Sequence, residues 1–214
     1  MVLRHVWSPG ETSDVSGPAS NLRNYLEQRD VRRCLNVAAA ETGIRAAGDV
    51  GCGYGRLTMV LSEFCSAVTG FEREGDLVAE ASRLLPAIEF VKVASLADLP
   101  KPPSSFDFMM TFTVLQHLHD AEAQAVLAEI KRLVAKGFVL LTEETDASFR
   151  DGDIDVENGG VTIGRSVETY RRWMEPCELV LQFPRQIEPG YARENVGTYM
   201  LFRRPPDGGQ PRER

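Results

Sequence analysis

Short apolar segments alternate with amphipathic segments through the middle of the chain, and this alternation constrains the fold more than any other feature. The apolar segments lie at 46–50, 67–71, 88–93, 106–111 and 138–142. Between them, apolar residues recur every three or four positions, as in helices that bury one face. These helical patterns lie at 55–64, 76–84 and 120–134, with Asp120 as the expected N-cap of the last. Strands that alternate with helices predict an α/β fold: a doubly wound, mainly parallel sheet covered by helices on both faces.

Both ends of the chain depart from this alternation. The first 19 residues are rich in Pro, Gly and Ser, which predicts an irregular arm. Two cap helices are expected next, with Asp30 as the N-cap of the second. Residues 143–164 are polar and Gly-rich and predict a long loop. The remaining expected elements are helices at 21–29, 31–42 and 166–174, and strands at 179–187 and 197–203. We therefore predict an arm with cap helices over 1–44, an α/β domain over 45–203 and a disordered tail over 204–214.

Composition excludes several classes of protein. The 214 residues suffice for one domain with a sizeable core. The net charge of -7 disfavours a nucleic-acid partner, since such binding draws on clustered Lys and Arg. The four cysteines lack CxxC spacing, so neither a disulfide framework nor a metal site is expected. The chain shows no signal-peptide pattern and no apolar run of roughly 18 residues, the length a membrane helix needs. We therefore expect a cytoplasmic protein without a membrane segment, of undetermined oligomeric state.

A glycine-rich loop, DVGCGYGR at 49–56, follows the first expected strand. Ligands of doubly wound sheets bind at the carboxyl ends of the strands, next to such loops. A phosphate-binding P-loop would need GxxxxGK followed by Ser or Thr, which is absent here. The dinucleotide fingerprint GxGxxG would need glycine where the chain has Arg56. The carboxylate of Asp49 would repel a pyrophosphate and attract a cation. The loop therefore favours a ligand with a positive end and no phosphate.

These residues resemble the first motif of the class I S-adenosylmethionine (SAM)-dependent methyltransferases, whose cofactor is cationic and carries no phosphate. Further segments resemble the later motifs of that family in the same order. These segments are 68–72, 90–100, 104–118 and 164–170. The resemblance covers about residues 45–203. It implies a Rossmann-like, seven-stranded sheet with an antiparallel last strand, and SAM as the cofactor.

The resemblance also implies which residues bind the cofactor. Glu72 matches the acid that accepts hydrogen bonds from the ribose hydroxyls. The family's usual adenine-binding acid is missing, because Ala94 or Ser95 holds its place, which leaves the Ser95 hydroxyl and the Leu96 N–H as contacts. Thr111 lies at the strand end below the sulfonium. The predicted cofactor-binding residues are Asp49, Gly51, Cys52, Gly53, Tyr54, Gly55, Glu72, Arg73, Ser95, Leu96 and Thr111.

His117 is the predicted catalytic residue. It follows the fourth expected strand, close to where the resemblance places the methyl acceptor, and imidazole titrates in the range useful to a general base. Two readings of Glu143 and Glu144 stay open: they bind an amine or act as a base, or they are solvated acids at a strand end. Likewise Arg165 and Tyr170 either shape the acceptor pocket or serve in packing and on the surface.

The acceptor class follows from motifs that are absent. The fourth-strand end reads Thr111-Phe112-Thr113, without the Asn/Asp-Pro-Pro-aromatic motif of enzymes that methylate base amines. It also lacks the carboxylates of metal-dependent catechol methyltransferases. We therefore predict a small-molecule acceptor that is methylated on O or N.

Two alternatives to this enzyme remain open. The missing adenine acid is consistent with a methyltransferase-like protein that binds SAM without catalytic activity. The glycine loop also leaves an NAD-type Rossmann enzyme as a rival, against which Arg56 and Asp49 weigh.

Overall fold

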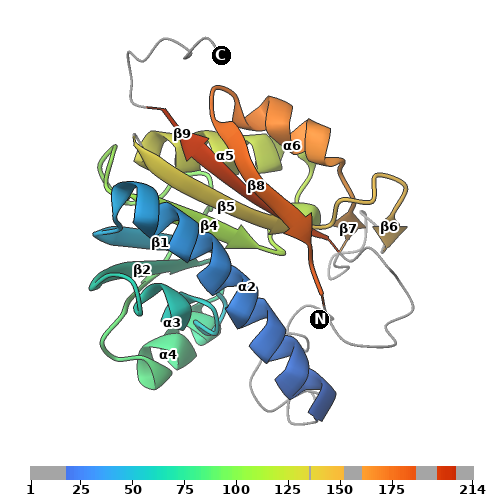
Figure 1. Ribbon diagram of the computed structural model, residues 1–214. Coiled ribbons are helices and arrows are strands. Elements are labelled where there is room, and N and C mark those ends of the chain that lie inside the picture. The colour runs from blue at the N-terminus through green and yellow to red at the C-terminus, as the bar shows by residue number, and fades with distance from the viewer. Residues whose placement is uncertain (1–17, 135, 152–160, 187–196, 206–214) are drawn as a thin grey trace.

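The structure is a computed structural model that describes residues 18–134, 136–151, 161–186 and 197–205 (Figure 1). Nearly all of the predicted N-terminal arm and most of the predicted tail lie outside the described residues.

A seven-stranded sheet in the order β3-β2-β1-β4-β5-β9-β8 forms the centre of the molecule. Its strands are β1 Ala46–Val50, β2 Ala67–Glu72, β3 Glu89–Lys92, β4 Phe108–Phe112, β5 Gly137–Glu143, β8 Glu178–Pro184 and β9 Thr198–Arg204. Neighbours among β1 to β5 pair in parallel, whereas β9 pairs antiparallel with both β5 and β8. The predicted fold class, with its antiparallel last strand, is confirmed.

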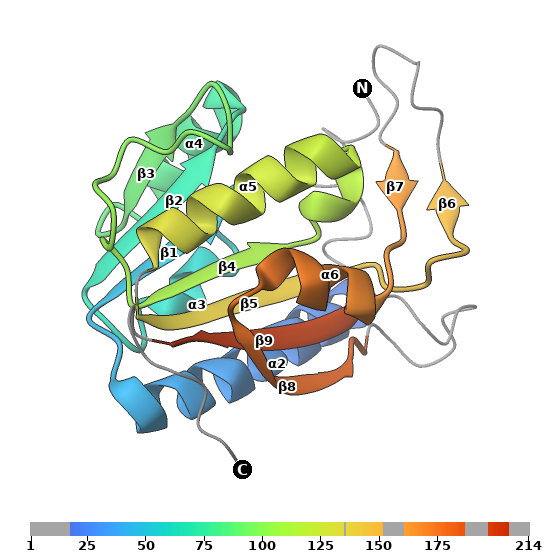
Figure 2. The ribbon, with the colours of Figure 1, turned by 90° about the horizontal axis from the view of Figure 1, so that it is seen from above.

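Helices cover both faces of this sheet (Figure 2). They are α2 Pro18–Thr42, α3 Thr58–Leu61, α4 Gly75–Leu84, α5 Asp120–Leu133 and α6 Val167–Met174. Residues of α5 and α6 form one buried core with Met109, and residues of α2 and α3 form a second core with Met110. Adjacent residues of a strand point to opposite faces, so β4 contributes to both cores. This double burial explains why β4 and β5 are mostly apolar and do not alternate with polar residues.

The predicted break between two cap helices is wrong, because α2 runs continuously through Asp30. Asp30 is only 4% exposed, and its carboxylate accepts a hydrogen bond from Nε of Arg29 at 2.8 Å. Neither proline nor glycine interrupts 19–42, and the apolar stripe of Val31 and Leu35 continues to the helix end. Because the Asp30 carboxylate is bound by the neighbouring Arg29 side chain, it is satisfied inside the helix and does not act as an N-cap.

Two other helix starts also differ from prediction. The helix expected to begin at Gly55 begins only at Thr58. Gly55 adopts a positive φ of 85°, which is not helical, and the residues between Gly55 and Thr58 form turns. His119 takes the N-cap position of α5, with extended backbone angles, and Asp120 is the first helical residue. An acid in the first turn still favours the helix through the macrodipole.

The expected loop at 143–164 contains two short strands, β6 Arg150–Asp151 and β7 Thr162–Ile163, which pair antiparallel. Periodicity is undetectable in two residues, so the sequence offered no signal for this pair. None of the described helices has the length and apolar character to cross a membrane.

Candidate functional site

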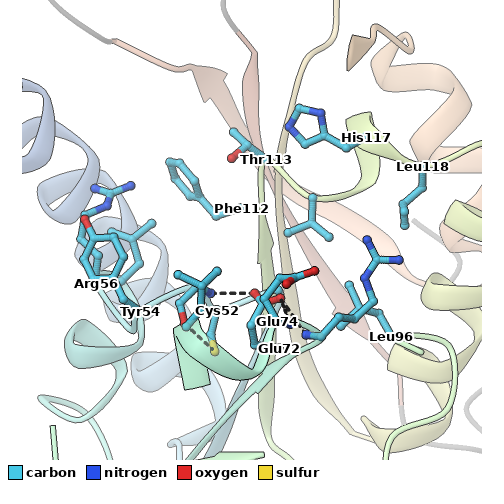
Figure 3. Close-up of a pocket in the computed structure, with 16 residues that line it drawn as sticks. Cys52, Tyr54, Arg56, Glu72, Glu74, Leu96, Phe112, Thr113, His117 and Leu118 are labelled. Atoms are coloured by element: carbon cyan, nitrogen blue, oxygen red, sulfur yellow. Dashed lines mark hydrogen bonds between the residues drawn. The ribbon is translucent and has the colours of Figure 1, made fainter. Parts of the chain in front are cut away.

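A cavity of about 210 Å³ opens at the carboxyl ends of β1, β2 and β4 (Figure 3). Its lining comes from segments far apart in the sequence, which the parallel strands bring to one edge of the sheet. The glycine loop contributes Gly51, Cys52, Gly53, Tyr54, Arg56 and Leu57. The β2–α4 turn and α4 contribute Glu72, Arg73, Glu74 and Leu77, and the chain after β3 contributes Leu96. The chain after β4 contributes Phe112, Thr113, Val114, His117 and Leu118.

The glycine loop is tied to the end of β2 through its backbone. The N–H groups of Gly51 and Cys52 both donate to the carbonyl of Phe71, at 2.8 and 3.1 Å. Gly51 has a φ of 76°, and a Cβ there would lie 2.5 Å from Cγ2 of Val114. Gly53 has a φ of 55° but has open space where a Cβ would stand. Glycine at 51 therefore permits close packing, and glycine at 53 leaves the loop backbone bare towards the cavity.

Glu72 presents a fixed carboxylate at the cavity. Its Oε2 accepts from the N–H of Gly53 at 3.0 Å, and its Oε1 accepts from the N–H groups of Arg73 and Glu74 at 2.7 and 3.1 Å (Figure 3). A carboxylate offers about four acceptor positions, and these three hydrogen bonds leave one of them, on Oε2, for a ligand. A carboxylate oxygen held in this way can accept a hydrogen bond from a ligand hydroxyl.

Asp49 lies behind the loop instead of on the cavity lining. It is 2% exposed and accepts a hydrogen bond from the hydroxyl of Thr58 at 2.6 Å. Burial raises the pKa of Asp49 to about 7, the charge of Glu72 adds to the rise, and the Thr58 hydrogen bond opposes it. A residue in this place supports the loop from below.

Three other predicted cofactor residues also lie off the lining. Gly55 faces Phe90, whose ring carbon would be 2.8 Å from an added Cβ. Ser95 is exposed, and its Oγ accepts from the N–H of Ala97 at 3.1 Å. Thr111 is fully buried and donates to Glu143 at 2.8 Å. The other predicted residues, Gly51, Cys52, Gly53, Tyr54, Glu72, Arg73, Leu96 and His117, all line the cavity.

One wall of the cavity was not predicted from the sequence. The guanidinium of Arg56 lies 5.7 Å from the ring centroid of Phe112, and its Nη1 contacts Glu27 at 2.7 Å and Asn24 at 2.9 Å. Arg185 also pairs with Glu27, at 2.6 Å. Burial raises the pKa of Glu27, but the adjacent arginines outweigh this and lower it to about 2. Glu27 is a charged residue on the apolar stripe of α2 that continues through Val31 and Leu35. This break in the stripe was the sequence signal that could have revealed Glu27 as a buried ion-pair partner.

Glu143 and Glu144 are 1% and 4% exposed, so reading them as solvated acids is wrong. Neither lines the cavity. The carboxylate of Glu143 accepts from the N–H of Val114 at 3.3 Å and of Gln116 at 3.1 Å, besides Thr111. Burial raises the pKa of Glu143 to about 7, against these hydrogen bonds. Glu143 therefore holds the 3-10 helix η1 (Leu115–His117), which starts three residues after β4 ends.

Arg165 holds the same short helix from the other side. Its guanidinium donates to the carbonyls of Leu115 at 2.8 Å and Leu118 at 2.5 Å, and to Asp120 at 2.8 Å. Arg165 is 4% exposed and Tyr170 is fully buried. Neither lines the cavity, so Arg165 shapes it only through η1, and Tyr170 belongs to the core.

His117 lines the cavity at the end of η1 (Figure 3). Its Nδ1 lies 2.7 Å from the carbonyl oxygen of Val161, beside β7. Burial lowers the pKa of His117, and this hydrogen bond opposes the change. A histidine that is neutral near pH 7 is a competent proton acceptor. Among the described residues, no cluster of three His, Cys, Asp or Glu side chains offers a metal site.

Comparisons with known proteins agree with this geometry. A family model described as a methyltransferase domain matches residues 48–137. An uncharacterized methyltransferase of Schizosaccharomyces pombe is 32% identical over 110 residues, which are 46% of this chain and 39% of that protein. An uncharacterized methyltransferase of Geobacillus kaustophilus is 26% identical over 145 residues, 68% of this chain and 65% of that protein. The chain thus spans between 39% and 65% of the length of these curated relatives.

Among solved structures, magnesium protoporphyrin IX methyltransferase from Synechocystis PCC 6803 with bound SAM has a TM-score of 0.69 at 16% identity. The match covers 95% of this chain and 89% of that chain. At this identity the likeness concerns the fold.

Proposed function

We propose that the chain is a class I SAM-dependent methyltransferase and that it transfers a methyl group from SAM to a small-molecule acceptor. The observation that carries the proposal is the pairing of two features in one cavity. The carboxylate of Glu72 and the bare loop at Gly53 form one side, and the imidazole of His117 lies on another.

The residues present fit SAM. The carboxylate of Glu72, held by backbone N–H groups with one acceptor position open, suits a ribose hydroxyl, and the bare backbone at Gly53 leaves room for the methionine part. Leu77 and Leu96 offer apolar contacts for the adenine ring, in place of the acid that other members of the family use. We therefore propose that the predicted cofactor residues on the lining bind SAM, and that Asp49 acts from behind the loop.

Bound SAM supplies a methyl group on a sulfonium, which leaves as a neutral thioether. The protein has to align the acceptor behind that methyl group and exclude water, and alignment alone can contribute on the order of 7–11 kcal/mol. Phe112, Val114 and Leu118 give the cavity an apolar wall next to His117. His117 stands where it can take a proton from an acceptor bound against this wall.

Calorimetric titration with SAM, S-adenosylhomocysteine and NAD tests the proposal. We expect both adenosyl compounds to bind and Glu72→Ala to weaken them about 30-fold, since a hydrogen bond to a charged group contributes about 2 kcal/mol. The matched control is Glu80→Ala, on α4, because Glu80 pairs with Arg83 and does not line the cavity. The Glu80→Ala variant should bind both adenosyl compounds as tightly as the unaltered protein does.

Each alternative has its own outcome in this experiment. Binding of NAD without binding of SAM would replace the proposal with a Rossmann dehydrogenase-type enzyme. Binding of SAM without turnover of any hydroxyl, amine or carboxylate compound would favour a non-catalytic protein. Equal affinities for Glu72→Ala and its control would remove Glu72 from the site.

A further inference from the structure

The side chain of Gln116 lies between the end of β5 and His117 and is 9% exposed. Its Oε1 accepts a hydrogen bond from the backbone N–H of Glu144 at 2.9 Å. Its Nε2 lies 3.4 Å from Nε2 of His117. The amide of Gln116 therefore connects the end of β5 to the imidazole in the cavity.

These contacts select one tautomer of His117. A backbone N–H can only donate, so the oxygen of Gln116 faces Glu144 and its NH₂ group faces the imidazole. The NH₂ group can only donate in turn, so Nε2 of His117 must carry a lone pair. The carbonyl of Val161 can only accept, so Nδ1 must carry the hydrogen. Two separate contacts on opposite sides of the ring thus agree on a neutral imidazole.

We propose that Gln116 is a positioning residue that holds His117 as the neutral Nδ1–H tautomer, and that the methyl acceptor is a hydroxyl group whose proton Nε2 takes. This inference rests on the proposed function and names its acceptor class. At 3.4 Å the amide donates only a weak hydrogen bond to Nε2, so an incoming hydroxyl can replace it.

A hydroxyl fits this site better than an amine does. An amine reaches the enzyme as an ammonium ion and needs a carboxylate nearby, but the cavity residues next to η1 in the described chain are Thr113, Val114 and Leu118. The lining carboxylates Glu72 and Glu74 lie across the cavity from His117 (Figure 3). A carboxylate acceptor would need no base. A neutral hydroxyl needs a base, and Nε2 supplies it.

The step balances with the groups named. The acceptor O–H gives its proton to Nε2 of His117, and the oxygen forms a bond to the methyl carbon. The bond from that carbon to sulfur breaks, and its electron pair stays on sulfur. The products are a methyl ether, an imidazolium and a neutral thioether, and the imidazolium then loses its proton to water.

The charges around the imidazole come from several elements. Glu143 and Glu144 lie at the end of β5 behind η1, and Arg165 precedes α6 and binds the carbonyls of η1. Across the cavity stand Glu72, Arg73 and Glu74. Substitution of Gln116 by Glu adds one carboxylate opposite Nε2 without changing any of these groups.

Nitrogen NMR of the imidazole tests the tautomer without any substrate. The chain has three histidines, so His117→Asn identifies the signal of His117. We expect the Nδ1–H tautomer at neutral pH. In Gln116→Glu we expect the midpoint of the titration to rise by about 1 to 2 pH units, because an opposite charge in contact favours the imidazolium. Gln116→Met, of similar size but without polar atoms, should leave the midpoint within about 0.5 unit.

Outcomes that overturn the inference are distinct from failure of the proposed function. A wild-type Nε2–H tautomer, or an unchanged midpoint in a folded Gln116→Glu, would remove Gln116 as a positioning residue. Should Gln116→Glu fail to fold, a kcat for a hydroxyl acceptor that is unchanged in a folded Gln116→Met would do the same. Turnover confined to amines would overturn the hydroxyl assignment. Loss of SAM binding would instead refute the proposed function and leave the NMR result standing.

Discussion

At the scale of single residues, the two glycines of the loop that line the cavity meet different surroundings. Gly51 packs against Val114, whereas Gly53 has no neighbour where a side chain would start. Both adopt positive φ, which costs an L-residue about 1–2 kcal/mol. The motif spacing alone does not reveal which glycine is required by packing and which by backbone conformation.

Gly51→Ala and Gly53→Ala therefore form a matched pair. We expect Gly53→Ala to lower the free energy of unfolding in urea by about 1 kcal/mol, from backbone conformation alone. Gly51→Ala should cost at least about 2 kcal/mol more, because its Cβ collides with Val114. Val114→Ala in the Gly51→Ala background should recover part of the loss. Equal costs for the two single substitutions would contradict this account.

At the scale of elements, η1 depends on side chains from elsewhere in the chain. Three residues cannot form a stable helix by propensity alone, since nucleation is unfavourable. Glu143 binds the N–H groups of η1 and its neighbour Val114, and Arg165 binds the carbonyls of Leu115 and Leu118. This pair of opposite charges keeps His117 at the cavity.

Arg165→Ala should therefore destabilise the protein by about 2–3 kcal/mol, because it leaves two buried carbonyls without their donor. Arg171→Ala is the control: Arg171 lies on α6, its side chain is 57% exposed, and its removal should change the free energy of unfolding by less than about 0.5 kcal/mol. Urea denaturation of both variants measures the difference. A cost for Arg165→Ala equal to that of the control would show that η1 holds without it.

At the scale of the whole molecule, buried carboxylates whose pKa values shift in opposite directions determine how stability depends on pH. Burial raises the pKa values of Asp49 and Glu143 to about 7, whereas three arginines lower that of Glu27 to about 2. The first two groups hold their protons more tightly in the folded state than in the unfolded state. They therefore make the free energy of unfolding fall as pH rises from about 4 to about 7.

Glu27 acts in the opposite direction, and its contribution is lost as pH falls from about 4.5 towards 2. We expect the ligand-free protein to be most stable near pH 4 to 5. Glu143→Gln should reduce the decline between pH 4.5 and 7, and Glu168→Gln, with a side chain 78% exposed, should leave it unchanged. Thermal unfolding measured across this range checks both. If stability still falls to the same extent between pH 4.5 and 7 in Glu143→Gln, groups other than Glu143 cause the decline.

Much of the architecture was predictable because β1, β2, β4, β5 and α5 bury continuous or periodic apolar residues, which mark their positions in the sequence. Boundaries were less predictable. Asp30 was predicted to be an N-cap but is a buried residue inside α2. The sequence cannot distinguish these cases, because an aspartate carboxylate can be bound by a backbone N–H at a helix start or by a side chain within the helix, as Arg29 binds it here. The segment from 143 to 164 read as loop because β6 and β7 are too short to show a period.

The sequence by itself determined the doubly wound sheet and the glycine loop, because these depend on local periodicity and on spacing along one βαβ unit, and its resemblance to a family pointed to Glu72. Only the tertiary structure decided which residues reach the cavity. Asp49, Thr111 and Ser95 turn away from it, while Arg56 and Phe112 join its wall. It also buried Glu143 under η1 and placed Gln116 and Val161 on opposite sides of His117. Such contacts join residues up to 44 positions apart, and no local pattern in the chain encodes that distance.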